Sequence, residues 1–353
     1  APSIRVTLGE CFGLPIGTNV EGKMVTALRR LGFDKVFDVD TAADFTILEE
    51  GTEFLSRLNG GGTLPLITSC SPGWVRYLEQ HAPDMLHNIS SCKSPQQMFG
   101  AVAKTYYAQK MGWDPHDVVS VSVMPCTAKK YEASRPELGR DGYQDVDYVL
   151  TTRELAKLIR YVGLDLSVLP ESEFDSPLGT GSGAGAIFGA TGGVMEAALR
   201  SAYFLTTGEN PSADAFCEVR AVENESRPWR EAAFDLAGTT IHCAVASGLA
   251  NARHLIRAIK RREVHYEFVE IMACPGGCAG GGGQPGDGSD REKARGDVLF
   301  SLDEKSELRF SHENPAVKAL YNEYLSSPCS ERAEELLHCD HFAWQMPQTG
   351  IHV

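Results

Sequence analysis

The sequence has no long basic or apolar run. Its 353 residues carry 33 Lys and Arg against 47 Asp and Glu, a net charge of −14, without the basic stripe that neutralises phosphates. No apolar run reaches the roughly 18 residues that a membrane helix needs. We therefore expect no nucleic-acid partner and no membrane insertion. The first residues lack an initiator Met and a signal-peptide pattern, so we expect the chain to come from a longer precursor.

Three other patterns are missing, and each absence removes a class of site. Without G-K-[ST] there is no P-loop, and the formal G-x-G-x-x-G match at 281–286 contains Pro285 and lacks a strand–turn–helix context. Nucleotide binding is therefore not expected. The absence of C-x-x-C argues against a redox disulfide. The cysteines are not spaced as a disulfide framework either.

Apolar alternation and helical periodicity take turns along the chain, the pattern of an α/β protein. Capping boxes are predicted at Ser94 with Gln97 and at Thr151 with Glu154. The expected strands are 35–39, 64–68, 118–123, 239–246 and 266–271. The expected helices are 24–31, 42–58, 95–111, 155–162, 194–203, 249–259, 315–324 and 331–338.

Four of the ten cysteines follow the expected strands. Cys274 and Cys278 form a Cys-x3-Cys pair followed by glycines, Cys126 follows Pro125, and Cys70 precedes a Ser-Pro step. Sites in open α/β sheets gather where strands end, and glycine lets the backbone approach inorganic sulfide. The Cys-x3-Cys pair supplies two thiolates and the other two loops supply one each, which makes the four that a 4Fe–4S cube needs. Structural zinc, which normally uses two paired ligand sets, is the alternative left open.

The motifs around these cysteines resemble a known family. ITSCSPGW at 67–74, MPCTAKKYE at 124–132 and EIMACPGGC at 270–278, with GQP at 283–285, resemble the three signatures of iron-only (FeFe) hydrogenases, in order and with similar spacing. Segments 90–97 and 181–197 match as well. The resemblance therefore covers essentially the whole chain.

The family implies an H-cluster, a 4Fe–4S cube bridged through a cysteine sulfur to a di-iron unit with CO, cyanide and an azadithiolate. Cys278 corresponds to the bridging cysteine, and Cys126 and Cys274 to further cube ligands. The resemblance implies one catalytic domain over 1–353. Its expected fold is α/β, two lobes of mostly parallel sheet flanked by helices, about 1–150 and 151–300, with the metal cluster between them and a helical tail at 301–353. The implied reaction is the reversible reduction of protons to hydrogen.

The resemblance also assigns residues around the di-iron unit. Lys129 corresponds to the lysine that binds a cyanide, a role suited to an ammonium donor. The other expected cofactor-binding residues line the second cyanide, pack around the di-iron unit or belong to the matching segment 90–97: Pro2, Ser3, Met124, Phe188, Met272 and Gln96.

A proton route follows from the same resemblance. It runs through Cys70, Glu50, Ser90 and Glu53. Glu50 and Glu53 are three residues apart, hence on one helical face, which outside this family is usually just a solvated acidic face. Carboxylates relayed by a hydroxyl and a thiol supply the required proton-transfer chemistry.

The first signature departs from the family pattern. The family usually has two adjacent cysteines, the first for proton relay and the second for the cube, whereas here Cys70 is followed by Ser71. Ser71 ligating through oxygen, Cys70 recruited to the cube, and compensation by Cys92 are three open accounts. Because thiolate is the better ligand for iron, we expect Cys70 to hold the cube. A changed relay would make a sensory or low-activity role plausible.

The chain has no C-x2-C-x2-C-x3-C run and hence no ferredoxin-like domain of its own. Either such clusters lie on a missing N-terminal part or another subunit, or an external ferredoxin docks near the cube. The expected partners are a ferredoxin or a cluster-bearing subunit, H2 and protons as substrates, and maturation proteins for the di-iron unit. Reduced cysteines favour the cytoplasm, with an anaerobic organelle or the periplasm as alternatives. An iron–sulfur assembly protein is the competing class. It predicts loss of the residues that serve the di-iron unit, yet Lys129, Met124 and Met272 are present.

Overall fold

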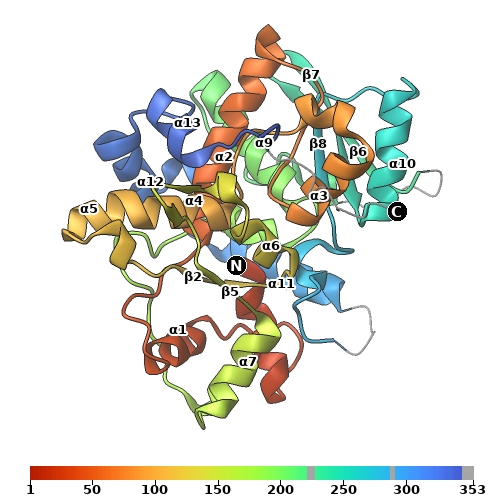
Figure 1. Cartoon of the computed structure of the whole chain (residues 1–353). Coiled ribbons are helices and arrows are strands. Elements are labelled where there is room, and N and C mark those ends of the chain that lie inside the picture. The colour runs from red at the N-terminus through yellow and green to blue at the C-terminus, as the bar shows by residue number, and fades with distance from the viewer. Residues whose placement is uncertain (221–226, 287–290, 344–353) are drawn as a thin grey trace, which may run out of the picture.

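The computed structural model describes residues 1–220, 227–286 and 291–343, which form a mixed α/β fold (Figure 1). No helix in these ranges has both the length and the apolar character to cross a bilayer. The strands are β1 (Leu66–Ile67), β2 (Val121–Met124), β3 (Gly139–Arg140), β4 (Tyr143–Gln144), β5 (Tyr148–Thr151), β6 (Arg230–Leu236), β7 (Thr239–Ser247) and β8 (Phe268–Met272). The helices are α1 (Glu21–Arg30), α2 (Asp40–Ser56), α3 (Pro72–His81), α4 (Pro95–Val102), α5 (Ala108–Met111), α6 (Ala128–Ala133), α7 (Thr152–Tyr161), α8 (Gly183–Ala186), α9 (Gly193–Thr207), α10 (Leu249–Lys260), α11 (Glu292–Lys305), α12 (Pro315–Leu320) and α13 (Glu331–Leu337).

The larger sheet has the strand order β1-β8-β7-β6. β1 and β7 run parallel to β8, with Ile67 opposite Val269 and Cys243 opposite Phe268, and β6 adds an antiparallel edge. β2 and β5 form a separate parallel pair. The expected parallel-rich α/β fold is confirmed. β1 pairs with β8 across the expected boundary between lobes at about residue 150.

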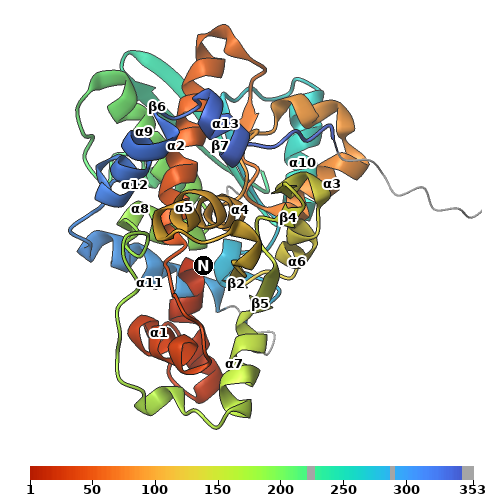
Figure 2. The ribbon, with the colours of Figure 1, turned by 60° about the vertical axis from the view of Figure 1, so that its left-hand side comes forward.

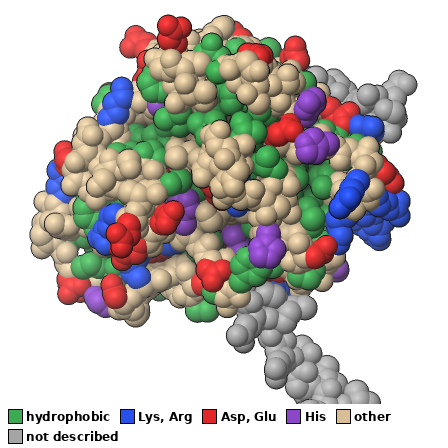
Figure 3. All heavy atoms as spheres, turned by 90° about the horizontal axis from the view of Figure 1, so that it is seen from above, with side chains coloured by type: hydrophobic (Ala, Val, Ile, Leu, Met, Phe, Trp, Pro, Cys, Tyr) green, Lys and Arg blue, Asp and Glu red, His purple; other side chains and the backbone are tan. Residues whose placement is uncertain are grey.

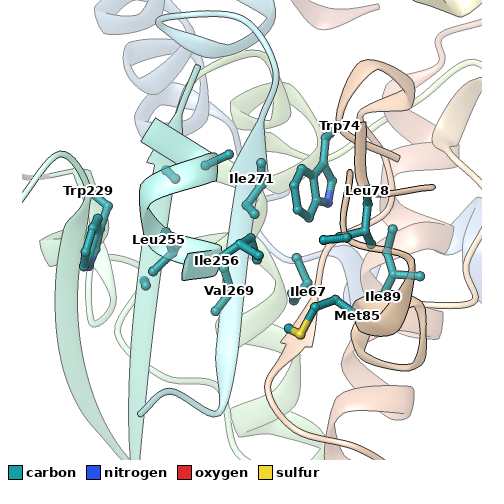
Figure 4. Packing of buried hydrophobic residues seen from close by; sticks show 14 of the residues in the cluster. Ile67, Trp74, Leu78, Met85, Ile89, Trp229, Leu255, Ile256, Val269 and Ile271 are labelled. Carbon is teal, nitrogen blue, oxygen red and sulfur yellow. The ribbon is translucent and has the colours of Figure 1, made fainter. Parts of the chain in front are cut away.

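One face of the larger sheet is covered by α3 and α10. Figure 4 shows Trp74 and Leu78 packing toward Ile67 and Ile271, with residues of α10 beside them. All five residues of β8 are buried, as expected for a strand covered on both faces. The apolar area removed from water here makes this cluster a rigid base for the loops that follow β1 and β8.

The opposite face is covered by α2 and α9. Phe54 of α2 stacks on Phe268 with ring centroids 4.8 Å apart, and Met195 and Leu199 of α9 join the same cluster. α1 and α7 form the lower end of the molecule, below the β2–β5 pair (Figure 2). α2 therefore runs through the interior, and its polar side chains are held at fixed positions.

The exposed surface is unevenly charged. Seen from above, Lys and Arg side chains gather at the right-hand edge, the side on which α10 lies in Figure 1 (Figure 3). The exposed basic residues in and just after α10 are Arg253, Arg257, Lys260, Arg261 and Arg262. This face contrasts with the net negative charge of the chain.

Two local predictions were wrong. Residues 35–39 do not form a strand. Val36 N–H instead donates to the Asp175 carboxylate at 2.8 Å, and this segment lines a cavity of about 840 Å³ opposite β2. The capping box at Ser94 is also absent, because the Ser94 hydroxyl donates to Glu132 at 2.9 Å. The box at Thr151 and Glu154 is confirmed.

Candidate metal centre

Three loops bring cysteines to the carboxyl ends of parallel strands. Cys70 follows β1, Cys126 follows β2, and Cys274 follows β8. Hydrogen-bonded strand pairs fix the first and third of these loops side by side, since β1 and β8 are neighbours. The arrangement is that expected of a site at the end of an α/β sheet.

Glycines let the second and third loops touch. A Cβ on Gly281 would lie 2.4 Å from the Pro125 carbonyl oxygen, and Gly283 N–H donates to that oxygen at 2.6 Å. Gly276 and Gly277 have φ of 72° and 73°, a backbone conformation that side chains disfavour. The Cys-x3-Cys turn can therefore form, and it presses against the residue that precedes Cys126.

Cys126, Cys274 and Cys278 lie close enough for the charge of one to affect the pKa of another. The pKa of Cys278 is raised to about 12, first by burial and then by the neighbouring Cys126 and Cys274. Burial also raises the pKa of Cys274, with Cys126 adding to the effect and the Gly282 N–H opposing it. Such thiols ionise readily only beside a strong positive charge, and a metal ion deprotonates a coordinating thiol outright. This donor set fits an iron–sulfur cluster.

Ser71 lies at the edge of this group. Its hydroxyl oxygen accepts a hydrogen bond from Ala273 N–H at 3.2 Å, beside Cys274. Cys70 instead packs against the cluster of buried residues that includes Phe188 and Met272. Burial raises its pKa well above the usual range, with Glu50 as the next cause, Lys129 opposing, and Cys278 a smaller contributor.

Cys92 does not join the three cysteines. Its sulfur lies 3.8 Å from Glu53, and the neighbours that raise its pKa after burial are Glu53, Glu50 and Glu49. The position of Cys92 therefore does not support the account in which it supplies the cube ligand that the first signature lacks.

Lys129 is held between two of the site loops. Its ammonium donates to the Cys70 carbonyl oxygen at 3.0 Å and to Glu132 at 3.1 Å. Gln96 donates to the same Glu132 carboxylate at 3.0 Å and to the Lys129 carbonyl at 3.2 Å. Gln96 thus contacts both Lys129 and Glu132, and it also lines the cavity opposite β2.

The expected apolar wall is assembled only in part. Phe188, in the short helix η9 (Ile187–Gly189), shares one cluster with Met272 and contacts the same group as Cys70. Met124 packs in a different cluster with Ala133, Val146 and Val149, close to Ala1. Phe188 and Met272 are therefore together, and Met124 belongs to a separate cluster.

Gln284 connects the N-terminal residues to the loop that contains Cys278. Ser3, in the short helix η1 (Pro2–Val6), accepts from the Gln284 amide at 3.1 Å, and that amide also donates to the Cys278 carbonyl at 3.1 Å. Pro2 starts this helix, and its carbonyl accepts from Arg5. Thr7 and Thr152 hydroxyls occupy the other end of Gln284 at 2.8 and 2.7 Å.

Of the four residues of the expected proton route, Glu50 and Ser90 are buried, and Cys70 and Glu53 are partly exposed. Glu50 is buried, and its two carboxyl oxygens make no hydrogen bond within the described residues. Its pKa is raised to about 8, first by burial and then by Glu53, and the nearby Ser90 and Ser69 backbone partly oppose this rise. Ser90 donates to Glu53 at 2.7 Å, and Glu53 also binds Arg57 at 2.6 Å.

Sequence reasoning missed Gln284, Glu132 and Arg57. Gln284 stands in a motif already singled out, but its partners lie up to 281 residues away and leave no local signal. Glu132 and Arg57 were detectable, because each is one helical turn from a partner that had been named, Lys129 and Glu53 respectively.

The comparisons with known proteins agree with this geometry. A family model described as the iron-only hydrogenase large subunit, C-terminal domain, matches residues 1–282, and one described as the iron hydrogenase small subunit matches 289–344. The chain therefore belongs to the iron-only hydrogenase family. The FeFe-hydrogenase HydA(deltaEFG), solved in a study of stepwise H-cluster assembly, superposes with a TM-score of 0.85 at 42% identity, covering 96% of this chain and 91% of that one.

Curated relatives include both hydrogenases and assembly proteins. HndD, a subunit of the NADP-reducing hydrogenase of Solidesulfovibrio fructosivorans, is 51% identical over 98% of this chain and 60% of its own length. Iron hydrogenase 1 of Clostridium pasteurianum is 46% identical over 96% and 59%. The chain thus spans about 60% of these two relatives. Cytosolic iron-sulfur assembly component 3 of Mus musculus is 32% identical over 100% of this chain and 75% of its own length.

Proposed function

We propose that this chain reversibly reduces protons to molecular hydrogen at an H-cluster held by Cys126, Cys274 and Cys278. The observation that carries the proposal is the convergence of these three thiols beside a buried carboxyl chain that leads from Glu50 outward. When bound, such a cluster supplies the electrons and the open metal position at which protons are reduced. The residues of the chain hold the cluster, exclude water and deliver protons.

We propose that Ser71, and not Cys70, is the fourth ligand of the cube. Its hydroxyl lies beside the backbone that precedes Cys274. Cys70 instead packs with Phe188 and Met272, and after burial Glu50 is the largest cause of its raised pKa. These contacts favour Cys70 as the inner end of the proton route. Cube ligation by Cys70 remains the alternative, since thiolate is the stronger ligand.

Proton delivery is proposed to follow Glu53, Ser90, Glu50 and Cys70. Glu53 is the outermost carboxylate and is fixed by Arg57, and the Ser90 hydroxyl bridges inward from it. A carboxyl with a pKa near ambient pH takes up and releases a proton with little driving force lost, which suits Glu50. The high pKa of Cys70 keeps its thiol protonated and able to donate.

Lys129 is proposed to face the di-iron unit as a cation. Its carboxylate partner Glu132 and the Cys70 carbonyl keep the ammonium between two site loops. Pro2 and Ser3, with Phe188 and Met272, would form the remaining wall, and Gln284 ties Ser3 to the Cys278 loop. Gln96 and Met124 would support this wall from the side of β2.

Electrons are proposed to come from a ferredoxin or a cluster-bearing subunit docking beside α10. This helix begins where Ser247 contacts the Cys274 loop, with Gly276 N–H donating to the Ser247 hydroxyl at 2.9 Å. Its exposed Arg253 and Arg257 offer positive charge to an acidic partner. All ten cysteines are free, which favours a reducing compartment such as the cytoplasm, although a periplasmic hydrogenase is among the relatives.

Iron–sulfur assembly is the competing function, because relatives of that class are 32% identical. The proton route favours the enzyme, since a passive cluster carrier has no use for a buried carboxyl near neutral pKa. Hydrogen output from the matured protein with reduced viologen decides between them. We expect sustained turnover, and an intact cluster with no output would remove the enzyme function and leave sensing or assembly.

A further inference from the structure

A second group of metal-binding side chains lies apart from the three cysteines, where the C-terminal segment packs on α2. Glu49, Cys329 and His338 each place one ligand atom within 4.8 Å of the other two. Glu49 is fully buried on α2, Cys329 precedes α13, and His338 directly follows it. Carboxylate, thiolate and imidazole together are a donor set typical of zinc.

The imidazole is oriented as a metal ligand would be. His338 Nδ1 lies 2.7 Å from the Ser91 hydroxyl, and Nε2 lies 3.0 Å from a carboxylate oxygen of Glu49. The Tyr321 hydroxyl donates to the other oxygen of that carboxylate. Outer partners of this kind, which fix ring orientation and carboxylate direction, are characteristic of metal sites.

Cys329 is held in place by an unusual backbone. Its φ is 53°, in the left-handed region that non-glycine residues rarely adopt, and its N–H donates to Glu49 at 2.7 Å. Its sulfur lies 3.5 Å from the Glu49 carbonyl oxygen. The surrounding contacts therefore maintain a costly conformation that keeps this thiol beside the carboxylate.

Glu53, Cys92 and His338 form a second group whose ligand atoms all lie within 4.8 Å of one another. Its carboxylate is already committed to Ser90, the Ser91 N–H and Arg57. The Arg57 guanidinium is a cation that already neutralises Glu53 and would repel a metal ion. The contacts of the Glu49 carboxylate are instead to the Tyr321 hydroxyl, the Cys329 N–H and the His338 ring, so the Glu49 group is the better site.

We propose that Glu49, Cys329 and His338 bind one Zn²⁺ ion, with water as the fourth ligand. On binding, the Cys329 thiol forms a sulfur–zinc bond and releases its proton to solvent. The ion joins the C-terminal segment to α2 and stabilises the folded chain by its binding free energy. This proposal does not depend on hydrogen turnover.

The test uses the full chain with its iron–sulfur cluster reconstituted, titrated with Zn²⁺ against a chromophoric chelator. Zinc-edge X-ray absorption reports the ligands without interference from iron. We expect one zinc per chain, with one sulfur at about 2.3 Å and the remaining nitrogen and oxygen ligands at about 2.0–2.2 Å. More than one sulfur, or no zinc retained, would overturn the site.

Variants separate ligands from neighbours. Cys329→Ser and His338→Gln should weaken zinc binding by more than the roughly 10- to 100-fold that we expect for the outer partner in Ser91→Ala. Cys339→Ser, the adjacent cysteine of the same segment, is the control and should bind as the parent does. Iron content and zinc-free melting show that each variant is folded, and if His338→Gln is not, Cys329→Ser alone decides. Equal losses in Cys329→Ser and Cys339→Ser would refute the assignment.

Discussion

Glu50 is a buried carboxyl that forms no ion pair within the described residues, and both Glu53 and Cys70 are close enough to interact with it electrostatically. Glu50→Gln keeps the shape of the side chain and removes its ability to carry a proton. We expect hydrogen turnover to fall by about 10²–10⁴-fold, the usual worth of a positioned acid–base group, with unchanged iron content. Glu335→Gln on the exposed face of α13 is the control. A Glu50→Gln protein that turns over at the parent rate would exclude this route.

The same residue predicts how stability depends on pH. Burial raises the pKa of Glu50 from 4.5 to about 8, so between these values the folded chain keeps a proton that the unfolded chain has lost. The free energy of unfolding therefore falls as pH rises through this window, by at most about 1.4 kcal/mol per pH unit from this group.

Glu50→Gln should flatten that dependence. Anaerobic urea unfolding of cluster-free protein at about pH 5.5, 6.5 and 7.5 measures it. Other buried acids, such as Glu270 with a pKa raised by burial to about 7, act in both proteins and cancel in the difference. Parallel pH profiles for parent and variant would show that Glu50 does not retain its proton.

At the scale of elements, the approach of two loops decides whether the cysteines can meet. A methyl group on Gly281 would press on the Pro125 carbonyl and separate the Cys278 turn from Cys126. We expect Gly281→Ala to lower the iron and sulfide bound after reconstitution to below half of the parent value. Gly286→Ala, where an added Cβ has open space, is the matched control. Full iron loading of Gly281→Ala would show that the contact is not needed.

The exposed basic residues of α10 indicate where an electron donor binds. Replacing Arg253 and Arg257 by Glu should raise the KM for an acidic ferredoxin several-fold, with the effect shrinking at high salt. Turnover with reduced viologen should not change, because the small dye needs no docking surface. Arg30→Glu on α1, at the other end of the molecule, is the control. A ferredoxin KM equal to that of the parent would place docking elsewhere.

Local pattern predicted most of the long elements, as the agreement for α2, β7 and α10 illustrates. It failed where distant partners decide the structure. The segment at 35–39 has strand-forming residues, yet its backbone bonds Asp175 rather than β2. Ser94 has a suitable capping partner in sequence, yet its hydroxyl binds Glu132. β6 was not expected, although it pairs with β7 along its whole length.

At the scale of the whole molecule, the site is assembled from segments far apart in sequence. The three-cysteine centre needs β1 beside β8 and the loop after β2 in contact with the loop after β8, and no local signal encodes either arrangement. The motifs named the cysteines, but only the fold shows that Ser71 faces the Cys274 loop and that Cys92 belongs with Glu53. The Glu49, Cys329 and His338 group was missed because its members span nearly 290 residues.

We propose that Cys278 joins an iron–sulfur cube to a second pair of irons. Infrared spectroscopy of the matured protein measures this most directly, because metal-bound CO and cyanide absorb where no protein group does. We predict such bands in the parent chain and their loss in Cys278→Ala. A matured parent protein with full iron content but no CO or cyanide bands would contradict the account.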